Sequence, residues 1–196
     1  MNLIFDIGGI IIDDSDKPLA QNLGLSPDEL ERFNQIVYLD ARWSDEVMLG
    51  KLSQADYAKS LIAQYPGYRT ALERAFLLEY QCKSLPRIAT NMTAIAQLKS
   101  RHQIYFLSNL TDVTYTYLQD FLSQFNGGAY SFQEHLKKPD PKFYQILLER
   151  YRLDPTEAIF FDDNARNIAA AQNIGITAYQ VSSPDQLPRL LQELSL

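Results

Sequence analysis

The chain has 196 residues and a net charge of −6, with 46% apolar and 21% charged residues. This size and composition are typical of a soluble globular protein with one domain, or with one domain and a smaller appendage. The negative charge argues against non-specific binding to nucleic acids and to anionic membranes, because both are polyanions.

The cysteine count and the first residues bear on the cellular compartment. Cys82 is the single cysteine, so an internal disulfide is excluded. The N-terminus lacks the basic leader and cleavage site of a secretory signal, and no segment is long and apolar enough to span a bilayer. We therefore expect a cytoplasmic protein without a membrane partner. The sequence leaves open whether it is a monomer or a dimer.

The first predicted element is a short strand at residues 3–5, and a long segment without a convincing strand follows it. Helical periodicity fills this segment. Ser26 begins a capping box with Pro at the first helical position, and Ser53 begins a second helix with an acid in its first turn. We expect a helical cap at residues 15–85. It is inserted into an α/β core domain that consists of residues 1–14 and 86–196, and its position suits a lid.

From residue 104 onward, predicted strands alternate with predicted helices. The apolar runs are continuous, which is typical of strands buried on both faces of a parallel sheet. Asp140 and Pro141 favour a helix start, and Gly175 suits a left-handed helix end. Strands are expected at residues 104–107, 129–132, 158–161 and 177–181, and helices at residues 111–124, from 140, at 164–174 and at 184–194. The alternation predicts an α/β fold with a doubly wound, Rossmann-like parallel sheet.

Four short polar segments lie at the ends of predicted strands or in a loop between elements. The first segment contains Asp6. It comes directly after the first strand and precedes Gly8 and Gly9, which favour a sharp turn. A free aspartate has a pKa of about 3.9, so it is ionised at neutral pH and can attack phosphorus. Alone, the motif fits an ordinary strand-to-loop turn equally well.

Ser108 and Asn109 end the next long strand. A serine hydroxyl and the backbone N–H groups near a helix start can hold phosphate oxygens. The alternative is that one of the two residues only caps the helix that follows.

Lys138 lies in a loop between Lys137 and the Pro-Asp-Pro run at residues 139–141. The two prolines stiffen the backbone, so the ammonium group can be held against a phosphate and a nucleophile. The alternative is an ordinary solvated lysine pair.

Asp162 and Asp163 end the fourth strand and repel each other unless a cation lies between them. Mg²⁺ prefers carboxylate and phosphate oxygens, and one or two protein carboxylates suffice to hold it. The alternative is a double-acid N-cap for the next helix.

In this order, the four segments resemble the haloacid dehalogenase superfamily of hydrolases. The resemblance covers the first strand and the chain from about residue 86 onward, while the insert is similar to that family's helical cap only in position and helix content. The Asp-x-Gly opening, Leu-Ser-Asn, Lys-Pro and the run at residues 160–168 are similar to the glucose-1-phosphate phosphatase branch.

The resemblance implies a role for each matched residue. Asp6 would be the nucleophile and a metal ligand, and Gly8 would offer its backbone carbonyl to Mg²⁺. Asp163 would be the main acidic ligand, Asp162 would ligate or orient through water, and Asn167 would support them. Ser108 and Asn109 would bind the phosphoryl oxygens, and Lys138 would stabilise their charge.

One departure from the family concerns Gly8, where most phosphatases of the superfamily carry a second Asp for acid–base catalysis. Such help is typically worth about 10²–10⁴-fold, or about 3–5 kcal/mol of barrier. A metal-bound water, a cap residue, or Asp13, Asp14 or Asp16 could substitute, and the sequence does not choose among them. His135 is a smaller departure, because relatives often have Gly there.

The predicted function is hydrolysis of a small phosphorylated metabolite, with a sugar phosphate favoured, by a Mg²⁺-dependent phosphatase with an aspartyl-phosphate at Asp6. Alternatives are a 2-haloacid dehalogenase, which needs no metal, and a catalytically weak phosphate-binding regulatory protein. In the cap, Arg42 and Trp43 are candidates for substrate contacts, although a role as an anchor in the core of the cap is favoured for Trp43.

Overall fold

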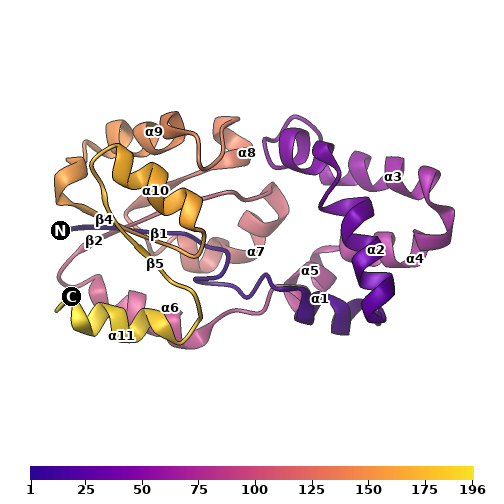
Figure 1. Ribbon diagram of the computed structural model, residues 1–196, viewed down its shortest axis with the longest axis horizontal. Helices are drawn as coiled ribbons and strands as arrows, with labels where there is room; N and C mark the ends of the chain where they lie inside the picture. The colour runs from indigo at the N-terminus through magenta and orange to yellow at the C-terminus, as the bar shows by residue number, and fades with distance from the viewer.

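The computed structural model describes residues 1–196 and has two lobes (Figure 1). One lobe holds a sheet with helices on both faces, and the other lobe is made of helices. Both chain termini lie on the sheet lobe, at the end away from the helical lobe. None of the helices combines the length and the apolar character needed to cross a lipid bilayer.

The sheet is parallel throughout, and its strands run in the order β3-β2-β1-β4-β5. This is the predicted doubly wound α/β fold. The strands are β1 (Asn2–Phe5), β2 (Gln103–Ser108), β3 (Gly127–Tyr130), β4 (Ala158–Asp162) and β5 (Thr177–Gln180). All five predicted strands are present. The third starts and ends two residues early, because the short helix α8 (Ser131–Glu134) takes up its predicted end.

The register of the central strands brings their carboxyl ends together. Phe5 pairs with Phe106 of β2 and with Phe161 of β4. The backbone N–H of Asp6 also donates a hydrogen bond of 2.9 Å to the carbonyl of Phe161. The polar residues that follow these strands therefore meet at one edge of the sheet. This is the topological switch point, where the strand order runs from β1 outward in both directions.

Helices cover both faces of the sheet, as the continuous apolar strands require. Leu3 and Phe5 face one hydrophobic cluster, and Ile4 faces the other. The first face carries α6 (Ala89–Leu98), α7 (Asp112–Leu122) and α11 (Gln186–Glu193), and the second carries α9 (Pro141–Tyr151) and α10 (Ala165–Asn173). Helix α6 has no counterpart among the predicted elements, because its N-cap residue Ile88 forms no side-chain cap.

The helical lobe has a hydrophobic cluster of its own, centred on the fully buried Phe33 and Tyr57. As predicted, Ser26 forms a capping box, and Ser53 caps its helix by accepting from the N–H of Asp56. Its elements are α1 (Asp16–Leu23), α2 (Pro27–Val37), a π-helical turn (Trp43–Val47), α3 (Gln54–Gln64), a 3₁₀ turn (Pro66–Tyr68), α4 (Arg69–Ala75) and α5 (Leu78–Ser84). We propose residues 15–85 as the cap domain and the remainder as the core domain.

The two lobes also touch beside the loop that precedes Lys138. Lys137 donates hydrogen bonds to the carbonyl of Ser44 at 3.0 Å and to the carboxylate of Asp45 at 2.8 Å. His135, in a left-handed conformation with φ of 55°, forms a ring-nitrogen bond of 2.7 Å with the carbonyl of Leu49. A Cβ atom at Gly50 would collide with the backbone of Phe132. The segment around Gly50 in the helical lobe and the segment around Phe132 in the sheet lobe therefore pack directly against each other. We call this set of contacts the latch.

The cap cluster gives a test of the proposed domain division. We expect Phe33→Ala to lower the free energy of unfolding of the cap by about 3–5 kcal/mol, because it empties a buried aromatic site. Hydrogen exchange should accelerate in residues 16–84 and stay slow in the five strands. Exposed Leu78→Ala is the matched control, and we expect a change below about 0.5 kcal/mol. Equal loss of protection in the strands would contradict the division.

Candidate active site

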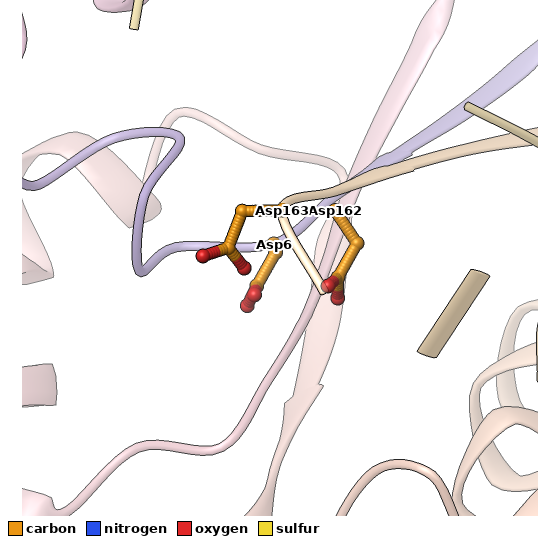
Figure 2. Close-up of side chains that lie close together, drawn as sticks. All are labelled: Asp6, Asp162 and Asp163. Carbon is orange, nitrogen blue, oxygen red and sulfur yellow. The ribbon is translucent and has the colours of Figure 1, made fainter. Parts of the chain in front are cut away.

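Three carboxylates gather at the carboxyl edge of the sheet, as the strand register requires. Asp6 follows β1, Asp162 ends β4 and Asp163 comes next in the chain. One oxygen from each lies within 4.8 Å of the others, and Figure 2 shows the three side chains pointing to the same side of the strand ends. Asp6 and Asp162 are buried, whereas Asp163 is exposed.

Lys138 is buried between two of these acids. Its Nζ lies 2.6 Å from Asp6 Oδ1 and 2.6 Å from Asp162 Oδ2. Burial by itself lowers the pKa of Lys138, but the charges of Asp6 and Asp162 outweigh it, and the net effect raises that pKa. The lysine is therefore held as an ammonium ion between the nucleophile candidate and the strand end of β4.

Asn109 fixes the loop that carries Lys138. Its Oδ1 accepts the backbone N–H of Lys138 at 2.8 Å, and its Nδ2 donates to the backbone carbonyl of the same residue at 3.2 Å. This two-way pairing spans the ends of β2 and the lysine loop. Pro139 and Pro141 also restrict the backbone of the loop that carries Lys138.

Asp6 has one occupied and one free carboxylate oxygen. Oδ1 accepts hydrogen bonds of 2.7 Å from the Ser108 hydroxyl and 2.7 Å from the backbone N–H of Ile7, in addition to Lys138. No protein group donates to Oδ2. Burial raises the pKa of Asp6 to about 7, against the opposing effect of Lys138. The side chain is thus fixed by one oxygen, while the other is available to a partner from outside the protein.

Asp162 and Asp163 differ in what they contact. Asp162 is saturated: it accepts from Lys138, from the backbone N–H of Asn164 at 2.8 Å and from Asn167 Nδ2 at 3.0 and 3.1 Å. The carboxylate of Asp163 accepts no hydrogen bond. Burial, helped by the charge of Asp162, raises the pKa of Asp163 to about 6. Asp163 is the acid that remains available to a cation, and Asp162 orients Lys138.

Gly9 is required beside Asp163. Its φ of 65° is left-handed, and a Cβ built on it would lie 2.8 Å from Asp163 Oδ2. The turn after Asp6 therefore approaches the second acid closely only because this residue has no side chain.

Asp14 fills the space of the side chain that Gly8 lacks. A Cβ built on Gly8 would collide with Asp14 Oδ2, and Asp14 Oδ1 accepts the backbone N–H of Gly9 at 3.1 Å. The chain returns to this point because the carbonyl of Ile7 accepts from the N–H groups of residues 10, 11 and 12, which curls the segment back. The carboxylate faces a cavity, and the surrounding protein desolvates it enough to raise the pKa of Asp14.

The other two acids offered by the sequence do not contact Gly8, although Asp16 also lines the cavity described below. Asp13 Oδ1 accepts the backbone N–H of Ser15, and Asp16 Oδ1 accepts from Asn34 Nδ2 at 2.9 Å. Among the three, Asp14 alone lies against Gly8.

A cavity of about 460 Å³ lies between the two lobes, next to Gly8 and Asp14. Gly8, Asp14 and Asn109 line its core end, and Trp43 lines its cap end. Arg42 does not line it. The guanidinium of Arg42 pairs with Asp40 at 2.6 Å and stacks 5.2 Å over the ring of Tyr57. Of the two cap candidates, the cavity thus receives Trp43, which also packs in the cap cluster.

The donor set at the sheet edge suits a divalent cation. Four carboxyl groups (Asp6, Asp14, Asp162 and Asp163) surround one ammonium group, so negative charge is in excess. The free oxygen of Asp6 and the unpaired carboxylate of Asp163 are hard donors of the kind that Mg²⁺ prefers. A phosphate ester bound at this edge would meet the free oxygen of Asp6, the ammonium group of Lys138 and a site for a cation.

Comparison with known proteins adds a family to this geometry. A model of the haloacid dehalogenase-like hydrolases matches residues 2–175. The D-ribitol-5-phosphate phosphatase of Bacteroides thetaiotaomicron is 24% identical over 91% of this chain and 90% of its own length. A phosphatase of Mycobacterium tuberculosis is 29% identical over 92% of this chain and 70% of its own length.

Another relative matches only in part. Acyl-CoA dehydrogenase family member 10 of Mus musculus is 38% identical over 71 residues, and this chain spans 7% of that protein's length. Among solved structures, a HAD family enzyme of Bacteroides thetaiotaomicron in complex with magnesium and inorganic phosphate has a TM-score of 0.73. It is 19% identical, with 91% of this chain and 92% of that chain covered, and it shares the fold.

The raised acid pKa values predict how stability depends on pH. Because the pKa of Asp6 (about 7) and the pKa of Asp163 (about 6) lie above the value of 3.8 for an unperturbed aspartate, the folded state binds more protons than the unfolded state. In EDTA, the free energy of unfolding should therefore rise as pH falls from about 8 to about 5.

Urea denaturation at each pH measures this slope, and Asp163→Asn should flatten it. A slope of the opposite sign in the wild-type protein would contradict the assignment of both acids.

Proposed function

Because this chain belongs to the haloacid dehalogenase-like hydrolase family, we propose that it is a Mg²⁺-dependent phosphatase of a small phosphorylated metabolite. A sugar phosphate is the favoured substrate, and the reaction passes through a phosphorylated Asp6. One observation carries the proposal. A buried carboxylate is fixed through one oxygen by Lys138 and Ser108, and its other oxygen has no protein partner.

Asp6 attacks phosphorus through this free oxygen, and the alcohol leaves on the opposite side. The Ser108 hydroxyl and the side chain of Asn109 lie at the edge where the phosphoryl oxygens arrive, and Lys138 offsets their charge. Asp162 and Asn167 act as positioning residues: Asp162 accepts from the ammonium group of Lys138, and Asn167 donates to the carboxylate of Asp162. Water then cleaves the aspartyl-phosphate and releases inorganic phosphate.

Asp14 takes the acid–base role that Gly8 leaves vacant. In the first step its carboxyl group gives a proton to the leaving alkoxide, and in the second it accepts a proton from the attacking water. Its position supports this role, since its carboxylate occupies the space of the missing side chain and faces the cavity.

Mg²⁺ would be held by Asp6, by Asp163 and by the backbone carbonyl of Gly8. When bound, it neutralises charge on the phosphate and on the nucleophile. The excess of carboxylates over cations at the edge supports this ligand set.

The substrate class has two kinds of support. The relative named D-ribitol-5-phosphate phosphatase matches nearly the whole chain, and the cavity beside Asp6 is of the size that holds a small metabolite. Membership of the glucose-1-phosphate phosphatase branch and a cytoplasmic location stay predictions.

The nucleophile is tested by Asp6→Asn. Phosphate release from a panel of sugar phosphates should fall by about 10³-fold or more, because Asp6 is the carboxylate that Lys138 and Ser108 fix through one oxygen while the other oxygen stays free to attack. Wild-type turnover should require Mg²⁺ and stop in EDTA, and Asp28→Asn at an exposed position of α2 serves as the control. Full activity in Asp6→Asn, or chloride release from 2-haloacids, would overturn the mechanism. Mg²⁺-dependent phosphate binding without any turnover would instead favour the regulatory alternative.

The acid–base role is tested by Asp14→Asn through the leaving group. For alkyl phosphates, kcat/KM should fall by about 10²–10⁴-fold. For p-nitrophenyl phosphate the loss should be much smaller, because that leaving group departs without a proton. Asp13→Asn is the matched control and should lose little with either substrate. Equal losses for alkyl and aryl esters in Asp14→Asn would assign this residue a structural role only.

A further inference from the structure

The cavity lies where the alcohol half of a bound phosphate ester would extend. It reaches the site at Gly8, Asp14 and Asn109, whereas Asp6 and Lys138 lie outside its walls. If phosphorus is bound at Asp6, as in the proposed function on which this inference rests, the leaving group occupies the cavity. The cavity wall then selects the substrate.

The wall carries no positive charge. Its lining contains no lysine, arginine or histidine, and its charged side chains are the acids Asp14 and Asp16. The nearby basic groups are engaged elsewhere, Arg42 with Asp40 and Lys137 with Asp45. A second phosphate or a carboxylate on the leaving group would be left unpaired and close to two acids, which is strongly unfavourable.

The rest of the wall is partly apolar and partly hydrogen-bonding. Trp43, Met48 and Phe76 contribute apolar surface from the cap. Asn34 also lines the cavity, and its Nδ2 donates to Asp16. Its amide group offers a hydrogen-bond partner to a hydroxyl of a ligand.

We infer that the enzyme acts on monophosphates of uncharged, hydroxylated alcohols and discriminates against esters that carry a second anionic group. One substrate hydroxyl bonds to the amide group of Asn34, and the C–H surface of the substrate packs against Trp43 and Met48. Neutral sugar and polyol monophosphates have this chemistry. Sugar bisphosphates, nucleoside polyphosphates and phosphorylated carboxylic acids do not.

Matched pairs of esters test the discrimination. Glycerol 3-phosphate is compared with 3-phosphoglycerate, glucose 6-phosphate with 6-phosphogluconate, and glucose 1-phosphate with glucose 1,6-bisphosphate. In each pair kcat/KM should be at least about 100-fold higher for the neutral alcohol, because the charged partner buries an unpaired anion.

Met48→Lys then adds one cation to the wall at a similar side-chain length. It should narrow the neutral-to-charged ratio of kcat/KM by about tenfold or more. Met48→Gln, which is similar in length and neutral, should keep the wild-type ratio. A narrowed ratio in both variants would mean that shape rather than charge sets the discrimination, and would overturn the inference.

Asn34→Leu tests the hydroxyl contact. It should lower kcat/KM for a polyol phosphate by about 3–10-fold relative to an n-alkyl phosphate of the same chain length, the value of one hydrogen bond. An unchanged ratio would overturn the assignment of Asn34.

p-Nitrophenyl phosphate separates two kinds of failure. If it is cleaved and the charged member of each pair is cleaved as fast as the neutral one, the substrate class is wrong and the phosphatase stands. If neither it nor any other ester is cleaved, the proposed function fails, and the inference fails with it.

Discussion

The site depends on one buried ammonium group held between two buried carboxylates. Lys138 lies 2.6 Å from both Asp6 and Asp162. Removing one partner from such a group costs about 3–5 kcal/mol, because it leaves a charge without a partner in the interior. The surroundings serve this contact: Asn109 pairs with the backbone of Lys138, and Asn167 holds the far side of Asp162. Lys138 can contact both Asp6 and Asp162 because the parallel register aligns the ends of β1 and β4.

Much of this arrangement could be predicted from the sequence, because the signals are local. The strands are continuous apolar runs, and Asp6, Ser108 and Asp162 lie at or directly after their ends. Parallel strands bring their carboxyl ends to one edge, so convergence of these residues follows from the fold class. The predicted third strand, residues 129–132, lies two residues later than β3, since Ser131 and Phe132 fit a strand as well as the short helix that they form.

What could not be predicted depends on tertiary contacts between segments without a periodic pattern. Asp14 reaches Gly8 because the carbonyl of Ile7 accepts three backbone N–H groups, which curls the chain back. Nothing in the sequence indicates that this turn brings Asp14, rather than Asp13 or Asp16, to Gly8. The cap is similar in this respect. Arg42 and Trp43 are adjacent, yet one turns to Asp40 and the other lines the cavity. The pair of Arg42 with Asp40 is local, but the side of the cap to which Trp43 turns is set by packing among helices, which a single sequence does not encode locally.

The latch between the lobes bears on the position of Lys138 and on its contacts with Asp6 and Asp162. Its core side is anchored at His135 and Lys137, and Lys137 is joined by one peptide bond to the ammonium-bearing residue. Because the two residues are adjacent, any displacement of Lys137 relative to the helical lobe would also act on the backbone of Lys138. The alignment of the ammonium group with Asp6 and Asp162 is therefore coupled to the contact between the two lobes.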